Sequence, residues 1–307
     1  MQRRQLLFGF AALGAACGAK PLPPPPAAPS VTSAVELIPA DLDVVVRLDL
    51  GRVKAALGAA ALVALAGEVL ARGKPDQGAD DLELSSLLEA DQVYLGYRPS
   101  PLWAPLDRVL ALQGRFTQLM GPPDGFSGAT DLGGDVRYWD AKTPPARGGV
   151  ARIYAMSQRL RAFVSEAEID AVERALAGLS AERRLLPPEE GTLSLAARPA
   201  LLGVLAGHGT LRELLDGAKA LHAVADLESD GVRLKAELLL QNAEQAEQLA
   251  SAAKLVLTRA LGDSAVRAEL RADADRVLLS AQLGRSQLLP ALGCLGLVPA
   301  GERRCPW

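Results

Sequence analysis

Apolar and polar positions along the chain predict strands and helices in a regular order from residue 43 onward. Residues 43–50, DVVVRLDL, have the length and apolar content of a strand, and the pattern after them predicts a helix over 51–72. Residues 91–98 and 108–116 are predicted to form a pair of strands. The first half is completed by a helical turn near Gln118, strands at 135–140 and 150–165, and a helix over 166–178.

The second half repeats this order of elements with little identity of residues. A strand at 192–198 leads into a helix over 199–217, and strands at 220–229 and 232–241 meet at Asp230-Gly231, a strong hairpin signal. A helix over 243–261 places six apolar residues on one face, namely Ala246, Leu249, Ala253, Val256, Leu257 and Ala260. The last predicted elements are strands at 265–273 and 276–284 and a short helix at 285–293.

Each half therefore reads strand, helix, strand, strand, helix, strand, strand, helix. This order predicts an α+β fold in which antiparallel sheets carry helices packed on one face, with the whole pattern duplicated. The first half covers residues 35–180 and the second covers 181–307. Two arrangements stay open at this point, one continuous sheet or a pseudo-twofold pair of sheets.

The segment before the first half has the pattern of an export signal. Arg3 and Arg4 precede an apolar run over 5–16 that ends on small residues. This run is well short of the roughly 20 apolar residues that a membrane-spanning helix needs. Residues 1–16 are therefore predicted to be a signal peptide. The Arg3-Arg4-Gln5-Leu6-Leu7 stretch also resembles a loose twin-arginine signal, so either export route stays open.

The residues around Cys17 resemble a bacterial lipoprotein signal, in which the cysteine after the cleavage point is acylated. Gly14 stands where that motif prefers Leu, Val or Ile, and Gly14-Ala15-Ala16 also suits an ordinary signal peptidase. The proline tract PLPPPPAAPS that follows favours an extended, semi-rigid form. Residues 17–34 are thus predicted to be a lipidated cysteine and a tether, with acyl chains as the membrane anchor. The resemblance implies a cell-envelope location with the folded part in the periplasm.

Residues 38–57, IPADLDVVVRLDLGRVKAAL, resemble the start of exported bacterial proteins in uncharacterised domain families. The shared features are a Pro-x-Asp turn, a hydrophobic strand that ends in Asp and a following helix. This resemblance implies no activity.

Charge and cysteine content narrow the range of partners. The chain has 33 Lys+Arg and 36 Asp+Glu, and loss of the signal peptide would bring the net charge from −3 to −5. No basic face is indicated, so nucleic acid is excluded as an expected partner.

With Cys17 assigned to lipid, Cys294 and Cys305 remain as a pair in an oxidising compartment, and we expect a disulfide between them.

Residues for catalysis or metal binding do not form a recognised motif. His208 lies between glycines in AGHGT and His222 lies in a predicted strand, and neither has metal-site spacing. No G-x-S-x-G and no phosphate-cradling loop followed by a lysine occur. The sequence therefore predicts no catalytic residues, no metal and no cofactor.

Aromatic residues are concentrated in the first half, and the second half has none before Trp307. Aromatic side chains gathered on one surface would mark a binding face, although burial in the core explains them equally. The long loop at 121–134 favours this region as a site. The predicted binding face consists of Trp103, Phe126, Tyr138 and Trp139.

The function expected from the sequence is that of a membrane-tethered envelope lipoprotein, a non-catalytic binding or scaffolding module for an unidentified envelope protein or ligand. Two alternatives stay open. One is a carrier of an apolar ligand or lipid between sheet and helices, which requires a deep apolar cavity. The other is an exported hydrolase centred near His208, which requires a polar cleft around that residue.

Overall fold

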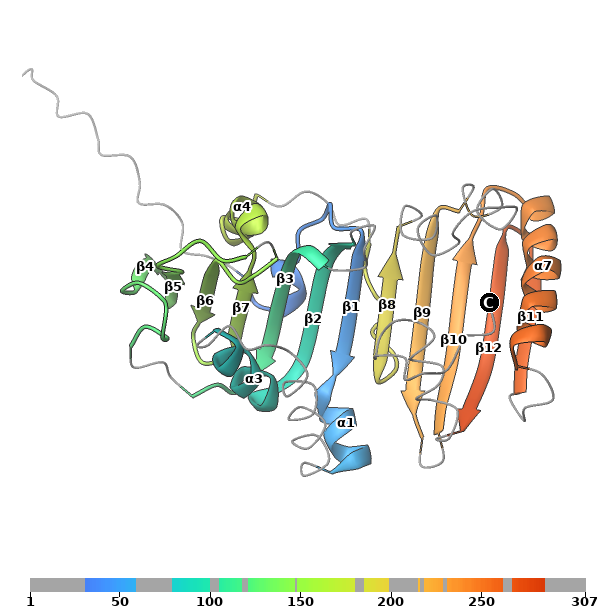
Figure 1. Cartoon of the computed structure of the whole chain (residues 1–307), viewed down its shortest axis with the longest axis horizontal. Helices are drawn as coiled ribbons and strands as arrows, with labels where there is room; N and C mark the ends of the chain where they lie inside the picture. Colours follow the sequence, from blue (N-terminus) through green and yellow to red (C-terminus); the bar gives the residue numbers. More distant parts are fainter. Residues whose placement is uncertain are drawn as a thin grey trace, which may run out of the picture.

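The computed structural model of the chain has one antiparallel sheet that runs through both halves (Figure 1). It describes residues 31–58, 79–99, 105–117, 121–146, 148–179, 185–198, 215, 218–228, 231–261 and 267–284. The strands of this part are β1 (Val44–Asp49), β2 (Ala90–Pro99), β3 (Pro105–Gly114), β4 (Thr130–Gly133), β5 (Val136–Asp140), β6 (Arg152–Met156), β7 (Leu160–Val164), β8 (Leu193–Ala197), β9 (Ala220–Leu227), β10 (Gly231–Leu239), β11 (Arg267–Asp273) and β12 (Arg276–Gly284). The helices are α1 (Leu50–Leu57), α3 (Ala79–Glu89), α4 (Ile169–Leu176) and α7 (Ala243–Leu261), with short 3-10 turns η1 (Ala34–Leu37) and η2 (Glu166–Glu168).

The strand order confirms the predicted α+β fold and its duplicated pattern. Outward from the centre, the first half runs β1, β2, β3, β7, β6 and the second half runs β8, β9, β10, β12, β11. The two first strands, β1 and β8, pair with each other in antiparallel fashion. One continuous sheet and a pseudo-twofold arrangement are therefore both present, because the sheet is built outward from a central pair of equivalent strands.

The first half departs from the predicted pattern in its outer strands. The prediction of a single strand over 150–165 is wrong, because this segment is the hairpin β6–β7, which corresponds in position to β11–β12. Strand β5 pairs with β6 on one side and with the unpredicted strand β4 on the other, which extends the sheet by one further hairpin. Helix α3 was also not predicted. The helical turn near Gln118 and the helix over 285–293 lie outside the described residues, as do most residues of the predicted helices 51–72 and 199–217.

Among the described residues, helices cover both faces of the first half and one face of the second. Helices α1 and α3 pack on one side of the sheet, against a cluster that includes Leu110 and Phe163. Helix α7 packs on this same side in the second half, over Leu238 and Val277. Helix α4 and the turn η1 cover the opposite side of the first half, over Val109. Because alternate residues of a strand point to opposite faces, β3 supplies apolar side chains to both layers.

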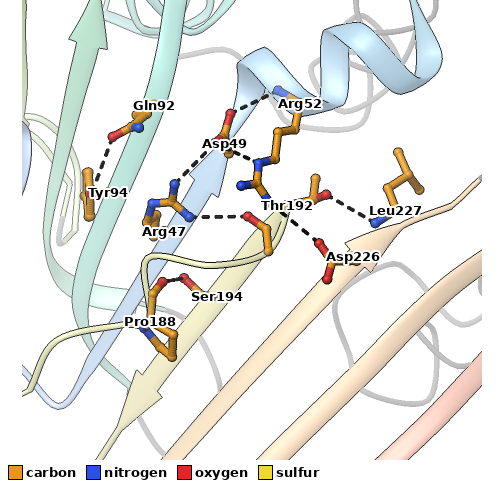
Figure 2. Close-up of polar contacts among 11 residues, drawn as sticks. Arg47, Asp49, Arg52, Gln92, Tyr94, Pro188, Thr192, Ser194, Asp226 and Leu227 are labelled. Atoms are coloured by element: carbon orange, nitrogen blue, oxygen red, sulfur yellow. Dashed lines mark hydrogen bonds and ion pairs between the residues drawn. The ribbon is translucent and has the colours of Figure 1, made fainter.

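A buried arginine joins the two halves at the central strand pair (Figure 2). The side chain of Arg47 in β1 is 6% exposed and lies 3.2 Å from the Asp49 carboxylate. Its other terminal nitrogen donates a hydrogen bond to the carbonyl of Gly191, which precedes β8. Asp49 also caps α1 by accepting a hydrogen bond from the amide of Arg52. One carboxylate thus neutralises the guanidinium and starts the helix.

Gly191 is required at this junction for two separate reasons. Its φ of +82° is in the left-handed region that favours glycine, and a Cβ there would lie 2.3 Å from a methyl carbon of Val224. The segment that leads into β8 therefore lies close to Val224 of β9 only because this position has no side chain.

Candidate functional site

A polar cleft of about 450 Å³ lies on the first half, over the strands β5, β6 and β7. Arg137, Ala155 and Arg161 occupy directly opposed positions on these three strands, so their side chains share one face. Adjacent strands are about 4.8 Å apart, which places the backbones of the two arginines about 10 Å from each other. The small side chain of Ala155 stands between them and leaves the floor of the cleft open.

The turn of the β6–β7 hairpin forms one wall of the cleft. Ser157, Gln158 and Arg159 make this turn, and all three line the cleft. Amides of the chain after β3 hold the turn in place, since Phe116 N donates to the Gln158 carbonyl at 2.9 Å and Gly114 N donates to the Arg159 carbonyl at 3.0 Å. The turn is therefore fixed to the sheet, and the Arg159 side chain extends from a rigid base.

Arg161 is the most buried charged residue of the cleft, with 4% of its surface exposed. Its guanidinium donates to the hydroxyl of Ser86 at 2.7 Å and to the carbonyl of Thr117, and its Cζ lies 4.8 Å from the centre of the Phe116 ring. All three contacts are with uncharged groups. They hold the guanidinium in one orientation, but they leave its charge unbalanced.

Burial lowers the pKa of Arg161 below its usual value, because the charged form loses hydration. The negative charge of Glu89 acts in the opposite direction. Glu89 is itself occupied by Thr117, whose amide and hydroxyl both donate to its carboxylate, at 2.8 and 3.0 Å. Arginine remains protonated at any physiological pH even with this shift.

Trp139 lies at the inner side of the cleft and is 3% exposed. Its indole Nε1 is buried and has no hydrogen-bond partner within the described part of the chain. More than nine in ten buried polar groups in proteins have such a partner. Trp139 thus contributes to the lining of the cleft, while its Nε1 is a buried donor.

The four aromatic residues predicted to share a binding face are not brought together. Trp139 lines the cleft, and Phe126 is buried behind it in the same apolar cluster. Tyr138 points to the opposite face, because neighbouring residues of a strand alternate. Trp103 lies outside the described residues.

Tyr138 belongs to a separate charged cluster on that opposite face. The guanidinium of Arg152 lies 4.0 Å from the centre of the Tyr138 ring, and it forms ion pairs with Asp140 at 2.6 Å and Glu173 at 2.5 Å. It also donates to the Tyr154 hydroxyl. Burial raises the pKa of Tyr154 to about 12, although the charge of Arg152 opposes this shift. This cluster pairs one guanidinium with two carboxylates and ties α4 to the sheet.

A second cavity, of about 470 Å³, lies on the second half over β9 to β12. Its lining combines bases and acids, among them Lys235, Arg271, Glu237 and Glu269, together with His222. With Glu190, this lining has three carboxylates against two bases, so charges of both signs lie close together there. It is therefore a weaker candidate than the arginine cleft.

Several predicted residues cannot be placed. Cys17, Cys294, Cys305 and His208 lie outside the described residues, so the lipidation site, the disulfide and the hydrolase centre stay predictions. Among the described residues, no three metal-ligating side chains form a group. No helix in the same part of the chain is long and apolar enough to cross a membrane.

Sequence reasoning missed the arginines of the cleft. Arg161 was part of a segment interpreted as one long strand, and its partners Ser86 and Thr117 are 75 and 44 residues away. The available signal was a charged residue inside LRAFV, a strand in which all five residues are buried. A buried arginine in such a strand indicates either an ion pair or a ligand.

Comparisons with known proteins reveal a likeness of fold. No family model and no curated protein matches the chain. Crystal form I of TP0453 matches with a TM-score of 0.53 at 11% identity, covering 87% of this chain and 99% of that one. Crystal forms III and IV match with TM-scores of 0.51 and 0.52 at 12% and 11% identity, each covering 85% of this chain and 98% and 97% of the other. At these identities the likeness extends to the fold alone.

Proposed function

We propose that the protein is a membrane-tethered lipoprotein of the cell envelope whose folded part is a non-catalytic binding module. The observation that carries this proposal is the open cleft lined by Arg137, Arg159, Arg161 and Trp139. Guanidinium and indole groups recognise ligands by hydrogen bonds and stacking. Asp135 is the one carboxylate in the described lining, and no histidine lies beside it there. The cleft is thus better suited to holding a ligand than to transferring protons.

The proposed membrane tether is supported by the sequence alone. The apolar leader, Cys17 and the proline tract supply the anchor, and the sheet would be held away from the membrane on an extended stalk. Of the two alternatives, the apolar carrier finds little support in the two cavities described above, because charged side chains line both of them. The hydrolase alternative depends on His208 and remains a prediction.

The anchor is tested by membrane fractionation of cells that produce the wild-type chain or Cys17→Ser. We expect the wild type in the membrane fraction, with a mass that matches an acylated N-terminal cysteine, and the variant outside it. Cys305→Ser is the matched control, since it removes a thiol without touching the leader. Equal fractionation of the wild type and Cys17→Ser would contradict lipid anchoring.

The binding role of the cleft is tested by thermal unfolding with a panel of charged, neutral and apolar small molecules. Ala155→Leu is the informative variant, because it fills the cleft floor and changes no charge. A compound that raises the Tm of the wild type and not of Ala155→Leu supports the module. If every stabilising compound acts equally on both proteins, binding occurs elsewhere and the cleft is not the site.

A further inference from the structure

Two arginines of the cleft lack a carboxylate partner within the described residues. Arg161 is buried and contacts a hydroxyl, a carbonyl and an aromatic ring. Arg159 is exposed, and its backbone amide donates to the Ser157 hydroxyl at 3.3 Å. By contrast, Arg47 and Arg152, whose side chains are 6% and 13% exposed, both form ion pairs. A buried charge without a counter-charge is unfavourable. The binding of an anion in this cleft would therefore be favoured electrostatically, because it would supply the missing counter-charge.

The charges near the cleft leave an excess of positive charge on its wall. Arg137 is partly neutralised by Asp131, at 3.8 Å, which stands outside the lining. The lining itself contains three guanidiniums, of Arg137, Arg159 and Arg161, and one carboxylate, that of the exposed Asp135. Glu89 acts on Arg161 from outside the lining, and its carboxylate is bound to Thr117. This is a local cationic site on a chain with a net charge of −3.

The polar groups of the cleft are mostly hydrogen-bond donors. Both guanidiniums donate, and the Ser157 hydroxyl accepts from the backbone amide of Arg159 and so keeps its own proton for a ligand. An arginine fork matches the oxygens of a phosphate, and two forks without carboxylates match its double charge. A singly charged carboxylate would leave half of this positive charge unbalanced.

We propose that the cleft binds a phosphate-bearing small molecule, with the phosphate between Arg159 and Arg161 and the rest of the molecule over Ala155 toward Arg137. A cavity of about 450 Å³ is much larger than a phosphate ion and lies in the range of small-molecule sites. This inference rests on the proposed binding function and adds the class of ligand. The same chemistry is offered by a soluble phosphomonoester and by a phospholipid headgroup.

The test is calorimetric titration of the full mature chain with glycerol 3-phosphate, with succinate as a carboxylate dianion of the same charge. We expect saturable binding of the phosphate compound and at least tenfold weaker binding of succinate. Vesicles of phosphatidylcholine with and without phosphatidic acid identify the source of the ligand. Binding to the soluble compound supports a free metabolite, and binding to phosphatidic acid vesicles alone supports a lipid headgroup.

Three variants locate the phosphate. Arg159→Gln is exposed and should fold normally, Arg161→Lys keeps the charge but loses the fork, and Ala155→Leu blocks the floor. Each should weaken binding at least tenfold. Arg174→Gln, an exposed arginine of α4 on the other face, is the control and should bind as the wild type does. Circular dichroism checks that each variant is folded. If Arg161→Lys unfolds, the binding measured for Arg159→Gln tests whether the arginines hold the phosphate.

The proposal is overturned if no phosphate probe binds, if succinate binds as tightly, or if Arg159→Gln and Ala155→Leu bind as the wild type does. These failures differ from failure of the binding function itself. If a ligand without phosphate stabilises the wild type and not Ala155→Leu, the proposed binding function is supported and the proposed phosphate ligand is contradicted.

Discussion

Arg47 and Arg161 are buried to nearly the same degree, with 5% and 4% of their surfaces exposed, yet their surroundings differ. Arg47 sits at the central strand pair against the carboxylate of Asp49, in a site where every group belongs to the framework. Arg161 sits under an open cleft and touches only uncharged groups. Burial of an arginine therefore does not by itself show whether the residue is structural or binds a ligand. The presence or absence of a counter-charge separates a structural arginine from one suited to a ligand.

The largest effect is expected for Arg47→Met. Removal of Arg47 leaves Asp49 in a largely buried position without its main partner, and such a broken pair costs about 3–5 kcal/mol. Urea denaturation measures the free energy of unfolding. The control is Arg52→Ala, whose side chain is 54% exposed and pairs with the same carboxylate, so it should cost about 1 kcal/mol or less. Equal losses for the two variants would show that Arg47 is not the structural cation of the junction.

A second change, Asp49→Asn, sharpens this result. Asparagine still caps α1 but carries no charge. When the two substitutions are combined, Arg47→Met therefore leaves no unpaired carboxylate behind. We expect the double variant to be more stable than the sum of the single losses predicts, by about 1–3 kcal/mol. Additive losses in the double-mutant cycle would contradict a direct pairing.

Arg161→Met should have a much smaller effect on stability. Methionine packs against Phe116, and loss of an unbalanced charge offsets the hydrogen bonds to Ser86 and Thr117, so we expect a change within about 1 kcal/mol. The same denaturation experiment measures it beside Arg47→Met. A loss as large as that of Arg47→Met would mean that Arg161 is a framework residue, and it would erase the distinction between the two sites.

The smallest expected effect concerns Arg152, the arginine on the opposite face that pairs with two carboxylates. Ultraviolet titration should find Tyr154 with a pKa of about 12, because burial favours the neutral phenol. A raised pKa in the folded state means that its contribution to stability is complete below pH 10.0, the ordinary value, and is lost as the pH rises toward 12.

Arg152→Gln should raise the pKa of Tyr154 further, since it removes the positive charge that favours the phenolate. Tyr97 lies on another strand and is the internal reference, with a pKa that burial also raises. A lower pKa of Tyr154 in the variant than in the wild type would show that Arg152 does not act on Tyr154 through its charge.

Much of the fold follows from the sequence, and the failures have local causes. Helix 243–261 was predicted with its observed bounds, because its apolar spacing is regular and a glycine follows it. The β6–β7 turn was missed because Ser157, Gln158 and Arg159 include no glycine or proline, although Ser157 takes a φ of +54°. Helix α3 has apolar residues all around and so gives no one-sided pattern.

The candidate site was only partly predictable, for a different reason. Trp139 was named from its composition and loop context, but Tyr138 beside it faces away, which the alternation of a strand would have indicated once β5 was recognised. The role of Arg161 depends on contacts with α3 and with the chain after β3. Such contacts are long-range and leave no periodic signal in one sequence.

Pairing of β1 with β8 has a consequence for copies of the protein held close together. Each half covers the inner edge of the other, so the free edges of the described sheet are β4 and β11 at its opposite ends. Strand β4 is short, irregular in register and fully exposed, and β11 carries alternating arginine and acidic side chains. Short or charged edges resist addition of further strands. The two ends of the described sheet are thereby poor templates for pairing with a neighbouring copy.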